Sequence, residues 1–151
     1  MKKNKISKNW LNKQKRDLYF NLSKIKGYRS RSAFKLIEMN KKFKIIKKDS
    51  KLLDLGSSPG GWSQVASEEI THGKILSVDI KQMEKIDKVN FIKGDFQKDE
   101  ILEKIINFFN NKADVVLSDM AANTSGNKDL DSYRTGELCL NSMSLATKIL
   151  N

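Results

Sequence analysis

Short apolar runs alternate along the chain with stretches of helical periodicity, and this alternation constrains the fold more than any other feature. The apolar runs predict strands at Lys51–Leu55, Lys74–Asp79, Val89–Lys93 and Ala113–Asp119. The periodic stretches predict helices over Gly61–Glu69, Asp99–Phe109 and Ser132–Leu150. Strands that are apolar along most of their length and are joined by helices are typical of a parallel sheet with helices on both faces. The sequence therefore predicts an α/β fold.

The first third of the chain carries the excess positive charge. Residues 1–50 hold 17 Lys and Arg but only 3 Asp and Glu, whereas residues 51–151 hold 12 and 15. Aromatic side chains are interleaved with these charges at Trp10, Tyr19, Phe20, Tyr28 and Phe34. Such a mixture favours an arm that binds a polyanion. A solvated lysine-rich tail is the alternative.

Helices are also predicted in this basic part, at Ser7–Gln14, at Asp17–Lys26 with Gly27 as its stop, and from Ser30 as N-cap to about Asn40. We expect residues 1–50 to form a basic helical extension that binds a polyanion. The cations expected to hold it include Lys24, Lys26, Arg29, Arg31, Lys41, Lys42, Lys44, Lys47 and Lys48. Residues 51–151 are expected to form a cofactor-binding core.

Composition excludes several classes of protein. No apolar run approaches the roughly 20 residues that cross a bilayer, and no secretory signal is recognised at the start of the sequence. One cysteine, Cys139, excludes an internal disulfide, and one histidine, His72, excludes a two-histidine metal site. We expect a monomer in a reducing compartment, the cytoplasm, without a metal and without a membrane, and we expect Cys139 to be packed in the core.

A glycine-rich turn follows the first predicted strand in the run DLGSSPGGW, from Asp54 to Trp62. Gly56 allows a sharp turn, and Gly60 and Gly61 are expected to let the backbone approach a ligand closely. The run is not the G-x-G-x-x-G pattern of dinucleotide sites, and it lacks the Gly-Lys-Ser/Thr of a phosphate-binding loop. A nucleoside therefore fits this turn better than a dinucleotide or a triphosphate.

Acidic residues stand at or just beyond the ends of the predicted strands, where an open parallel sheet binds its ligands. Asp54 lies within the first strand, whereas Asp79 and Asp119 close the second and fourth, and Asp95 follows the third. Asp79 is placed to accept both hydroxyls of a ribose, and Asp95 to accept the exocyclic amine of an adenine. Phe96 and Trp62 are candidates to flank the ring, although Trp62 can equally be core packing. These residues together predict a pocket for S-adenosylmethionine.

Several blocks of the chain resemble a known family. The blocks are Arg29–Leu36, Asp54–Gln64, Gly94–Phe96 and Leu117–Asn123. In order and spacing they resemble the FtsJ-type ribosomal RNA large subunit methyltransferase E family. The resemblance implies a Rossmann-like methyltransferase fold and S-adenosylmethionine-dependent 2′-O-methylation of a uridine ribose in 23S rRNA during ribosome maturation. The implied partner is large-subunit rRNA within the 50S ribosomal particle. The basic extension of residues 1–50 would then bind this RNA, with its cations on the phosphates and a ring such as Tyr28 stacked on a base.

The resemblance also implies roles for single residues. The cofactor-binding positions are Gly60, Trp62, Asp79, Asp95 and Asp119, and the catalytic positions are Lys35 and Asp119. The family's second catalytic lysine and its glutamate lie on strands after the long helix, beyond Asn151, so we expect a chain shortened at its C-terminus with its fourth strand at a sheet edge. The family usually has proline where this chain has Ala122.

The reaction explains why a lysine and an aspartate are needed together. A ribose hydroxyl is a weak nucleophile that must be aligned with the methyl group and must lose its proton, and a lysine oriented by Asp119 can steer the hydroxyl or accept that proton. Two other interpretations of the function stay open. One is a catalytically silent RNA-binding remnant, and the other is a 2′-O-methyltransferase for tRNA or for the mRNA cap.

Overall fold

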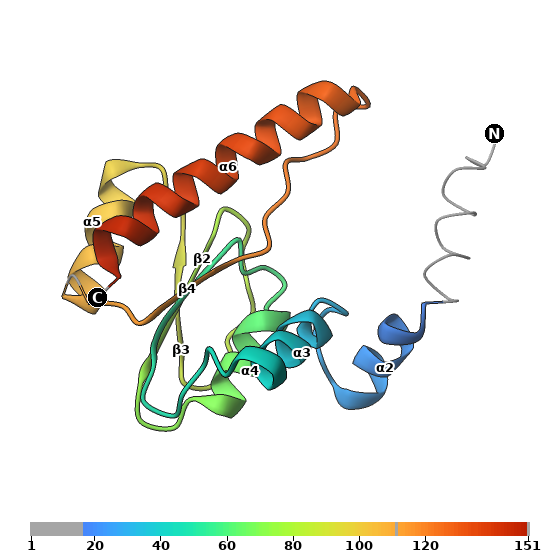
Figure 1. Ribbon diagram of the computed structural model, residues 1–151, viewed down its shortest axis with the longest axis vertical. Coiled ribbons are helices and arrows are strands. Elements are labelled where there is room, and N and C mark those ends of the chain that lie inside the picture. Colours follow the sequence, from blue (N-terminus) through green and yellow to red (C-terminus); the bar gives the residue numbers. More distant parts are fainter. Residues whose placement is uncertain (1–16, 111, 151) are drawn as a thin grey trace.

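Four parallel strands form the centre of the molecule in the computed structural model, which describes residues 17–110 and 112–150 (Figure 1). The sheet order is β3-β2-β1-β4, with every pair parallel. In chain order the elements are α2 (Leu18–Lys26), α3 (Ala33–Phe43), β1 (Lys51–Leu55), α4 (Gly61–Glu69), β2 (Lys74–Asp79), β3 (Val89–Lys93), α5 (Asp99–Phe109), β4 (Val115–Ser118) and α6 (Lys128–Ile149). The predicted helix Ser7–Gln14 lies outside the described residues.

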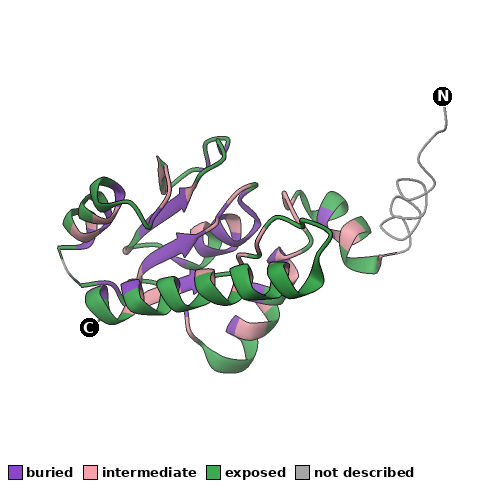
Figure 2. Ribbon diagram, turned by 90° about the horizontal axis from the view of Figure 1, so that it is seen from above, coloured by how far each residue is buried: buried purple, intermediate pink, exposed green. Residues whose placement is uncertain are grey.

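The side chains of the strands separate into two cores, one on each face of the sheet. On one face Leu53, Leu55, Leu76 and Val78 pack with residues of α5 and α6. On the other face Leu52, Ile75 and Leu117 pack with residues of α3 and α4. Because side chains alternate along a strand, each strand supplies both cores, and the purple interior in Figure 2 marks this three-layer arrangement. The α/β prediction is confirmed.

The bounds of most core elements agree with the sequence prediction. The structure has β1, α4, β2, β3 and α5 at the predicted residues. The fourth strand is shorter than predicted, because Ala113 leaves the ladder with β1 and instead forms an isolated parallel bridge with Leu150. The last helix begins earlier than predicted, because the Asn127 side chain accepts hydrogen bonds from the N–H groups of Asp129 and Leu130 and caps it.

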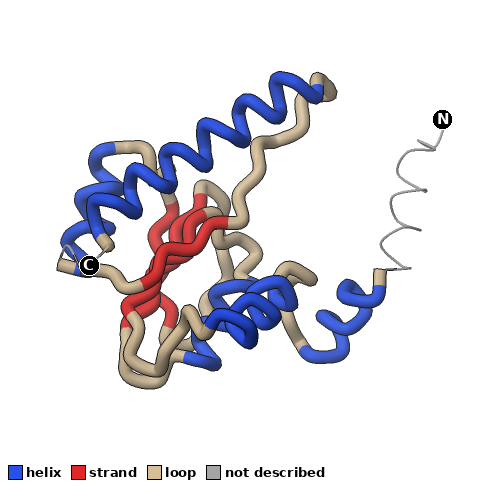
Figure 3. Tube along the Cα trace, viewed as in Figure 1, coloured by secondary structure: helices blue, strands red, loops and turns tan. Residues whose placement is uncertain are grey.

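The helix before the sheet differs from the prediction at both ends. Ser30 is not its N-cap, because residues 30–32 form a turn in which the Ser30 carbonyl accepts from the Ala33 N–H. The helix α3 begins at Ala33 and continues past Asn40 to Phe43. Ala33 and Leu36 are fully buried in the core beneath the sheet. The basic residues of α3 are therefore carried by a helix that packs in the α/β core. The tube view in Figure 3 shows helices lying beside the strands of the sheet.

The long helix α6 is only partly buried. Leu145 and Ile149 pack in the core with α5, whereas Leu140 and Met143 are exposed. Cys139 is also exposed, so the prediction that it is packed in the core is wrong. This part of α6 is exposed because the helix contacts the sheet mainly through its C-terminal half. Neither α6 nor any other helix among the described residues is long and apolar enough to cross a membrane.

Replacing two leucines of α6 tests this packing. Leu145→Ala removes a buried side chain and should lower the free energy of unfolding by about 2–5 kcal/mol. Leu140→Ala, on the exposed side of the same helix, should change it by less than about 0.5 kcal/mol. Urea unfolding followed by circular dichroism measures both values. Equal losses in the two variants would contradict the packing described here.

Candidate functional site

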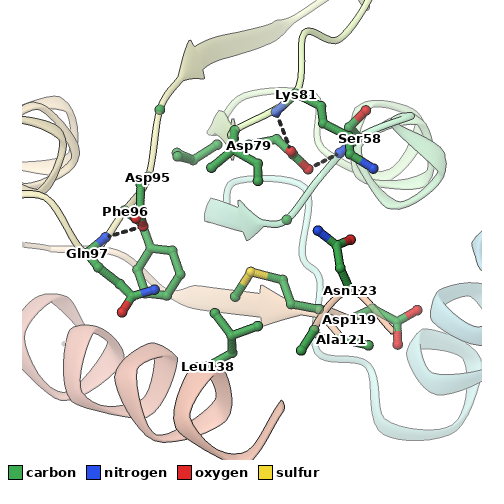
Figure 4. A pocket seen from close by; sticks show the side chains of 16 residues that line it. Ser58, Asp79, Lys81, Asp95, Phe96, Gln97, Asp119, Ala121, Asn123 and Leu138 are labelled. Carbon is green, nitrogen blue, oxygen red and sulfur yellow. Dashed lines mark hydrogen bonds between the residues drawn. The ribbon is translucent and has the colours of Figure 1, made fainter. Parts of the chain in front are cut away.

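A cleft of about 350 Å³ lies at the carboxyl edge of the sheet (Figure 4). Asp79 reaches it from the end of β2, Asp95 from the loop after β3, and Asp119 from the residue after β4. The sequence analysis expected these three carboxylates to meet at one edge, and the structure brings them together around one cleft. Its lining is otherwise mixed, with backbone of the glycine-rich turn on one side and the segment from Met120 to Asn123 on the other.

Asp79 is held in place by the backbone on both sides of it. One carboxylate oxygen accepts a hydrogen bond from the Ser58 N–H at 2.8 Å, and the other accepts from the Lys81 N–H at 2.7 Å. A carboxylate has about four lone-pair directions, so two remain for a ligand in the cleft. Asp79 therefore does two jobs, because it ties the glycine-rich turn to the end of β2 and presents acceptors to the cleft.

At one end of the cleft, an acidic side chain lies beside apolar ones. Asp95 accepts a hydrogen bond from the Gln97 N–H at 3.0 Å, which fixes the start of the loop before α5. Phe96, Met120 and Leu138 line the same part of the cleft. A carboxylate beside an aromatic ring and two flexible apolar side chains suits a flat heteroaromatic group that carries an amine.

Lys35 and Asp119 form the only ion pair between the helix layer and the cleft in the part of the chain that the structure describes. The Lys35 ammonium donates to the Asp119 carboxylate at 2.6 Å. The Lys35 side chain is 61% exposed and that of Asp119 38%. A lysine oriented by Asp119 was expected from the reaction, and the structure places the two groups in contact in an open setting. The arrangement orients a donor at the mouth of the cleft.

A second, smaller cavity of about 90 Å³ continues the cleft past Asp119 toward the first turn of α4. It is lined by Ser57, whose buried hydroxyl has no hydrogen-bond partner, and by Gly61 and Trp62. The first N–H groups of a helix have no partners within the helix, and Gly60 at the N-cap supplies no side-chain cap. This cavity therefore offers unused donors to a polar ligand group.

The glycines of the turn serve protein contacts as well as the turn itself. A Cβ at Gly56 would lie 2.1 Å from Met120, and one at Gly61 would lie 2.1 Å from the Ser30 hydroxyl. At Gly60, where φ is +113°, a Cβ would lie 2.8 Å from Ile86. The space beside Gly60 and Gly61 is thus occupied by other segments of this chain, where the sequence analysis expected a ligand.

Two of the predicted cofactor-binding residues do not line the larger cleft. Trp62 lies in the core between α3 and α4, where its indole N–H donates to the Ser32 carbonyl at 2.7 Å, and it borders only the smaller cavity. Gly60 borders neither cavity. The indole ring of Trp62 is packed in the core, which is the alternative that the sequence left open. Lys81 and Leu138 line the larger cleft, and nothing in their sequence context distinguished them.

Asp54 is the buried acid of the site. It is 2% exposed, accepts a hydrogen bond from the Ser63 hydroxyl at 2.6 Å, and lies below the smaller cavity. Ser63 is also hydrogen-bonded to Ser77, so one polar network joins β1, α4 and β2. The pKa of Asp54 is raised to about 7. Burial is the main cause, the charges of Asp79 and Asp119 act in the same direction, and the hydrogen bond from Ser63 acts in the opposite one.

Tyr28 does not present a free ring in this structure. Its ring packs edge-on against Phe34 with the centroids 5.7 Å apart, and its hydroxyl donates to the Glu68 carboxylate of α4 at 2.8 Å. Burial and this hydrogen bond raise the pKa of Tyr28 to about 12. The residue fastens the basic segment to α4.

Comparison with known proteins gives a consistent result. A family model described as FtsJ-like methyltransferase matches residues 28–151. A protein of Pelagibacter ubique (strain HTCC1062) named ribosomal RNA large subunit methyltransferase E is 53% identical over 150 residues, which cover 99% of this chain and 74% of that protein. A protein of the same name from Rickettsia bellii (strain RML369-C) is 47% identical, over 96% of this chain and 66% of its own length.

A solved structure is similar as well. The crystal structure of a protein described as a ribosomal RNA methyltransferase from Plasmodium falciparum superposes with a TM-score of 0.75 at 36% identity. The match covers 82% of this chain and 73% of that chain. Across these comparisons the chain spans 66% to 74% of the length of the proteins it matches.

The raised pKa of Asp54 predicts a pH dependence of stability. Between about pH 4 and pH 7 the folded protein holds a proton on Asp54 that the unfolded chain has lost, so the free energy of unfolding should fall as pH rises, by at most about 1.4 kcal/mol per pH unit. The Asp54→Asn variant lacks this titrating group. Its free energy of unfolding, compared with that of the unsubstituted chain, should therefore rise as the pH increases from about 4 to 7.

Urea unfolding at several pH values measures this difference, and Asp49→Asn, at an exposed turn residue, controls for the loss of a carboxylate. A constant difference between the Asp54→Asn variant and the unsubstituted chain from pH 4 to pH 8 would show that the buried acid is ionised throughout.

Proposed function

Because this chain belongs to the FtsJ-like methyltransferase family, we propose that it transfers a methyl group from S-adenosylmethionine to the 2′-oxygen of a uridine ribose in large-subunit rRNA. The observation that carries the proposal is the position of Asp119. It lines the cleft that suits the cofactor and at the same time holds the Lys35 ammonium at 2.6 Å. Cofactor binding and orientation of the substrate hydroxyl thus meet at one residue.

The chemistry of the two cavities fits S-adenosylmethionine. Asp79 would hold the ribose hydroxyls, Asp95 the adenine amine, and Phe96 the face of the ring. The smaller cavity, with the unpaired Ser57 hydroxyl and the start of α4 at Gly61 and Trp62, would hold the polar amino-acid end. Three carboxylates around one cleft favour a ligand with a positive charge and disfavour phosphates, which argues against a dinucleotide.

When bound, the cofactor supplies an electrophilic methyl group on a sulfonium. Lys35 donates a hydrogen bond to the substrate 2′-oxygen and orients it, and Asp119 fixes the ammonium in position. The methylated ribose oxygen loses one proton in the reaction, and the open setting of Lys35 allows that proton to pass to water. Orientation of the nucleophile is the main contribution of the pair, worth several kcal/mol of the barrier in general.

The charge of residues 17–50 supports RNA as the substrate. Lys24, Lys26, Arg31, Lys41, Lys42, Lys44, Lys47 and Lys48 are all exposed. Lys41 and Lys42 lie on α3, the helix that also carries Lys35, so a bound polyanion would lie near the mouth of the cleft. The relatives' name supports large-subunit rRNA over tRNA or a capped end. We propose that the protein works on the 50S particle in the cytoplasm, as a monomer.

Asp79→Asn tests the cofactor site. The amide keeps the shape of the side chain but loses one acceptor and the charge, and it faces a backbone N–H on each side. Affinity for S-adenosylhomocysteine should fall about 10- to 100-fold by isothermal titration calorimetry. Asp129→Asn, in the first turn of α6 and away from both cavities, should bind as the unsubstituted chain does. No binding by a folded, unsubstituted chain would refute the cofactor assignment.

Lys35→Ala tests the catalytic assignment. Methyl transfer from labelled S-adenosylmethionine to 50S particles that lack the modification should fall about 100- to 10,000-fold. Affinity for S-adenosylhomocysteine should stay unchanged, and the free energy of unfolding should change by less than about 1 kcal/mol, because the ion pair with Asp119 is exposed.

Offering different RNA substrates in the same assay distinguishes the competing functions. Naked 23S rRNA, tRNA and a capped RNA are offered beside the 50S particle. Transfer to tRNA or to the cap alone would contradict the proposed substrate. Cofactor and RNA binding without transfer to any of the four would favour the catalytically silent RNA-binding reading.

A further inference from the structure

Arg29 differs from the other basic residues of the described extension in what its guanidinium contacts. One nitrogen donates to the carbonyls of Glu84 at 2.7 Å and Pro59 at 3.3 Å, and the other donates to the carbonyl of Lys85 at 2.9 Å. The side chain is half-buried. The sequence analysis assigned Arg29 to RNA phosphates, whereas the structure directs its donors to the protein's own backbone.

The contacts of Arg29 join two walls of the cofactor cleft. Pro59 belongs to the glycine-rich turn, and Glu84 and Lys85 belong to the irregular segment 80–88 between β2 and β3. That segment begins with Ile80 and Lys81, which line the cleft directly after Asp79. Without regular secondary structure, its carbonyls depend on partners from elsewhere in the chain.

Packing around Gly60 completes the junction. Met83 and Ile86 of segment 80–88 are buried, and both lie against Gly60, as does the guanidinium of Arg29. The absence of a side chain at Gly60 thus makes room for the segment and for the arginine that ties it down.

The backbone of the same residue is fixed to helix α4. The Arg29 N–H donates to the Gln64 side chain at 2.7 Å, and the Gln64 amide donates to the Gly27 carbonyl at 3.1 Å. Six residues further on, α3 presents Lys35 to Asp119. Arg29 therefore stands where the segment leading to the catalytic lysine meets the cleft wall.

We propose that Arg29 is a positioning residue for the cofactor cleft, which holds segment 80–88 against the glycine-rich turn and thereby sets the affinity for the nucleoside of the cofactor. The cofactor part of this inference rests on the proposed function, whereas the restraint of segment 80–88 does not. Three carbonyl acceptors on two segments require a planar, multidentate donor, which arginine provides and lysine does not.

Arg29→Gln tests the proposal, with Arg31→Gln as a matched control. Arg31 lies two residues away, is exposed, and pairs with Asp17 instead of the cleft wall. Hydrogen–deuterium exchange by mass spectrometry of the full chain should show faster exchange of residues 80–88 in Arg29→Gln only. Affinity for S-adenosylhomocysteine should fall about tenfold in Arg29→Gln and stay within twofold in Arg31→Gln.

The salt dependence of RNA binding tests the alternative role of Arg29 as a phosphate contact. If Arg29 served as a phosphate contact, Arg29→Gln would reduce the slope of log affinity against log salt by about 0.7–0.9 and would leave exchange of residues 80–88 unchanged. That result would overturn the proposal. Faster exchange with undiminished affinity for S-adenosylhomocysteine would also overturn it.

Two further outcomes are distinguishable. Failure of the unsubstituted chain to bind S-adenosylhomocysteine would refute the proposed cofactor, while exchange at residues 80–88 would still decide whether Arg29 restrains the segment. If Arg29→Gln does not fold, Arg29→Lys replaces it. An intermediate loss of protection at 80–88 with an unchanged melting temperature supports the positioning role, and protection equal to that of the unsubstituted chain overturns it.

Discussion

Parallel pairing of the four strands is the constraint on which the site depends. Because the strands run in one direction, their carboxyl ends meet at one edge, and side chains from β2, β4 and the loop after β3 converge there although they are far apart in sequence. The convergence places Asp79, Asp95 and Asp119 around one cleft. Helix α3 packs against the same sheet and brings Lys35 to the edge from outside. The reaction proposed here needs both contributions.

Local patterns in the sequence predicted most of the sheet and placed Asp79, Asp95 and Asp119 at or just beyond the ends of its strands. Strand and helix bounds depend on hydrophobic periodicity over a few residues, and the acids at the strand ends are visible in the same runs. The pairing of Lys35 with Asp119 was expected from the chemistry of the reaction and not from such patterns. The contacts of Arg29 were not predicted, because they join residues far apart in the chain. Exposure of Cys139 was missed for a similar reason, since only tertiary packing decides which part of α6 touches the sheet.

Two acids of the site show how environment sets the role of a side chain. Asp54 is buried, hydrogen-bonded to a neutral hydroxyl, and has a raised pKa, so it serves as part of an internal polar network. Asp119 is partly exposed and is paired with an ammonium, so it can orient that group toward a substrate. Both lie beside the smaller cavity. The sequence places Asp54 within a strand and Asp119 at the end of one, and the structure shows that burial gives the two acids different roles.

The alternation of side chains along β1 makes the spacing of this strand as important as its composition. Leu52 and Asp54 face α3 and α4, whereas Leu53 and Leu55 face α5 and α6. Inserting or deleting one residue within β1 would exchange these two sets and drive a carboxylate into the apolar layer beneath α5 and α6. Natural length variation among related chains is therefore expected in the loops around the sheet and not within this strand.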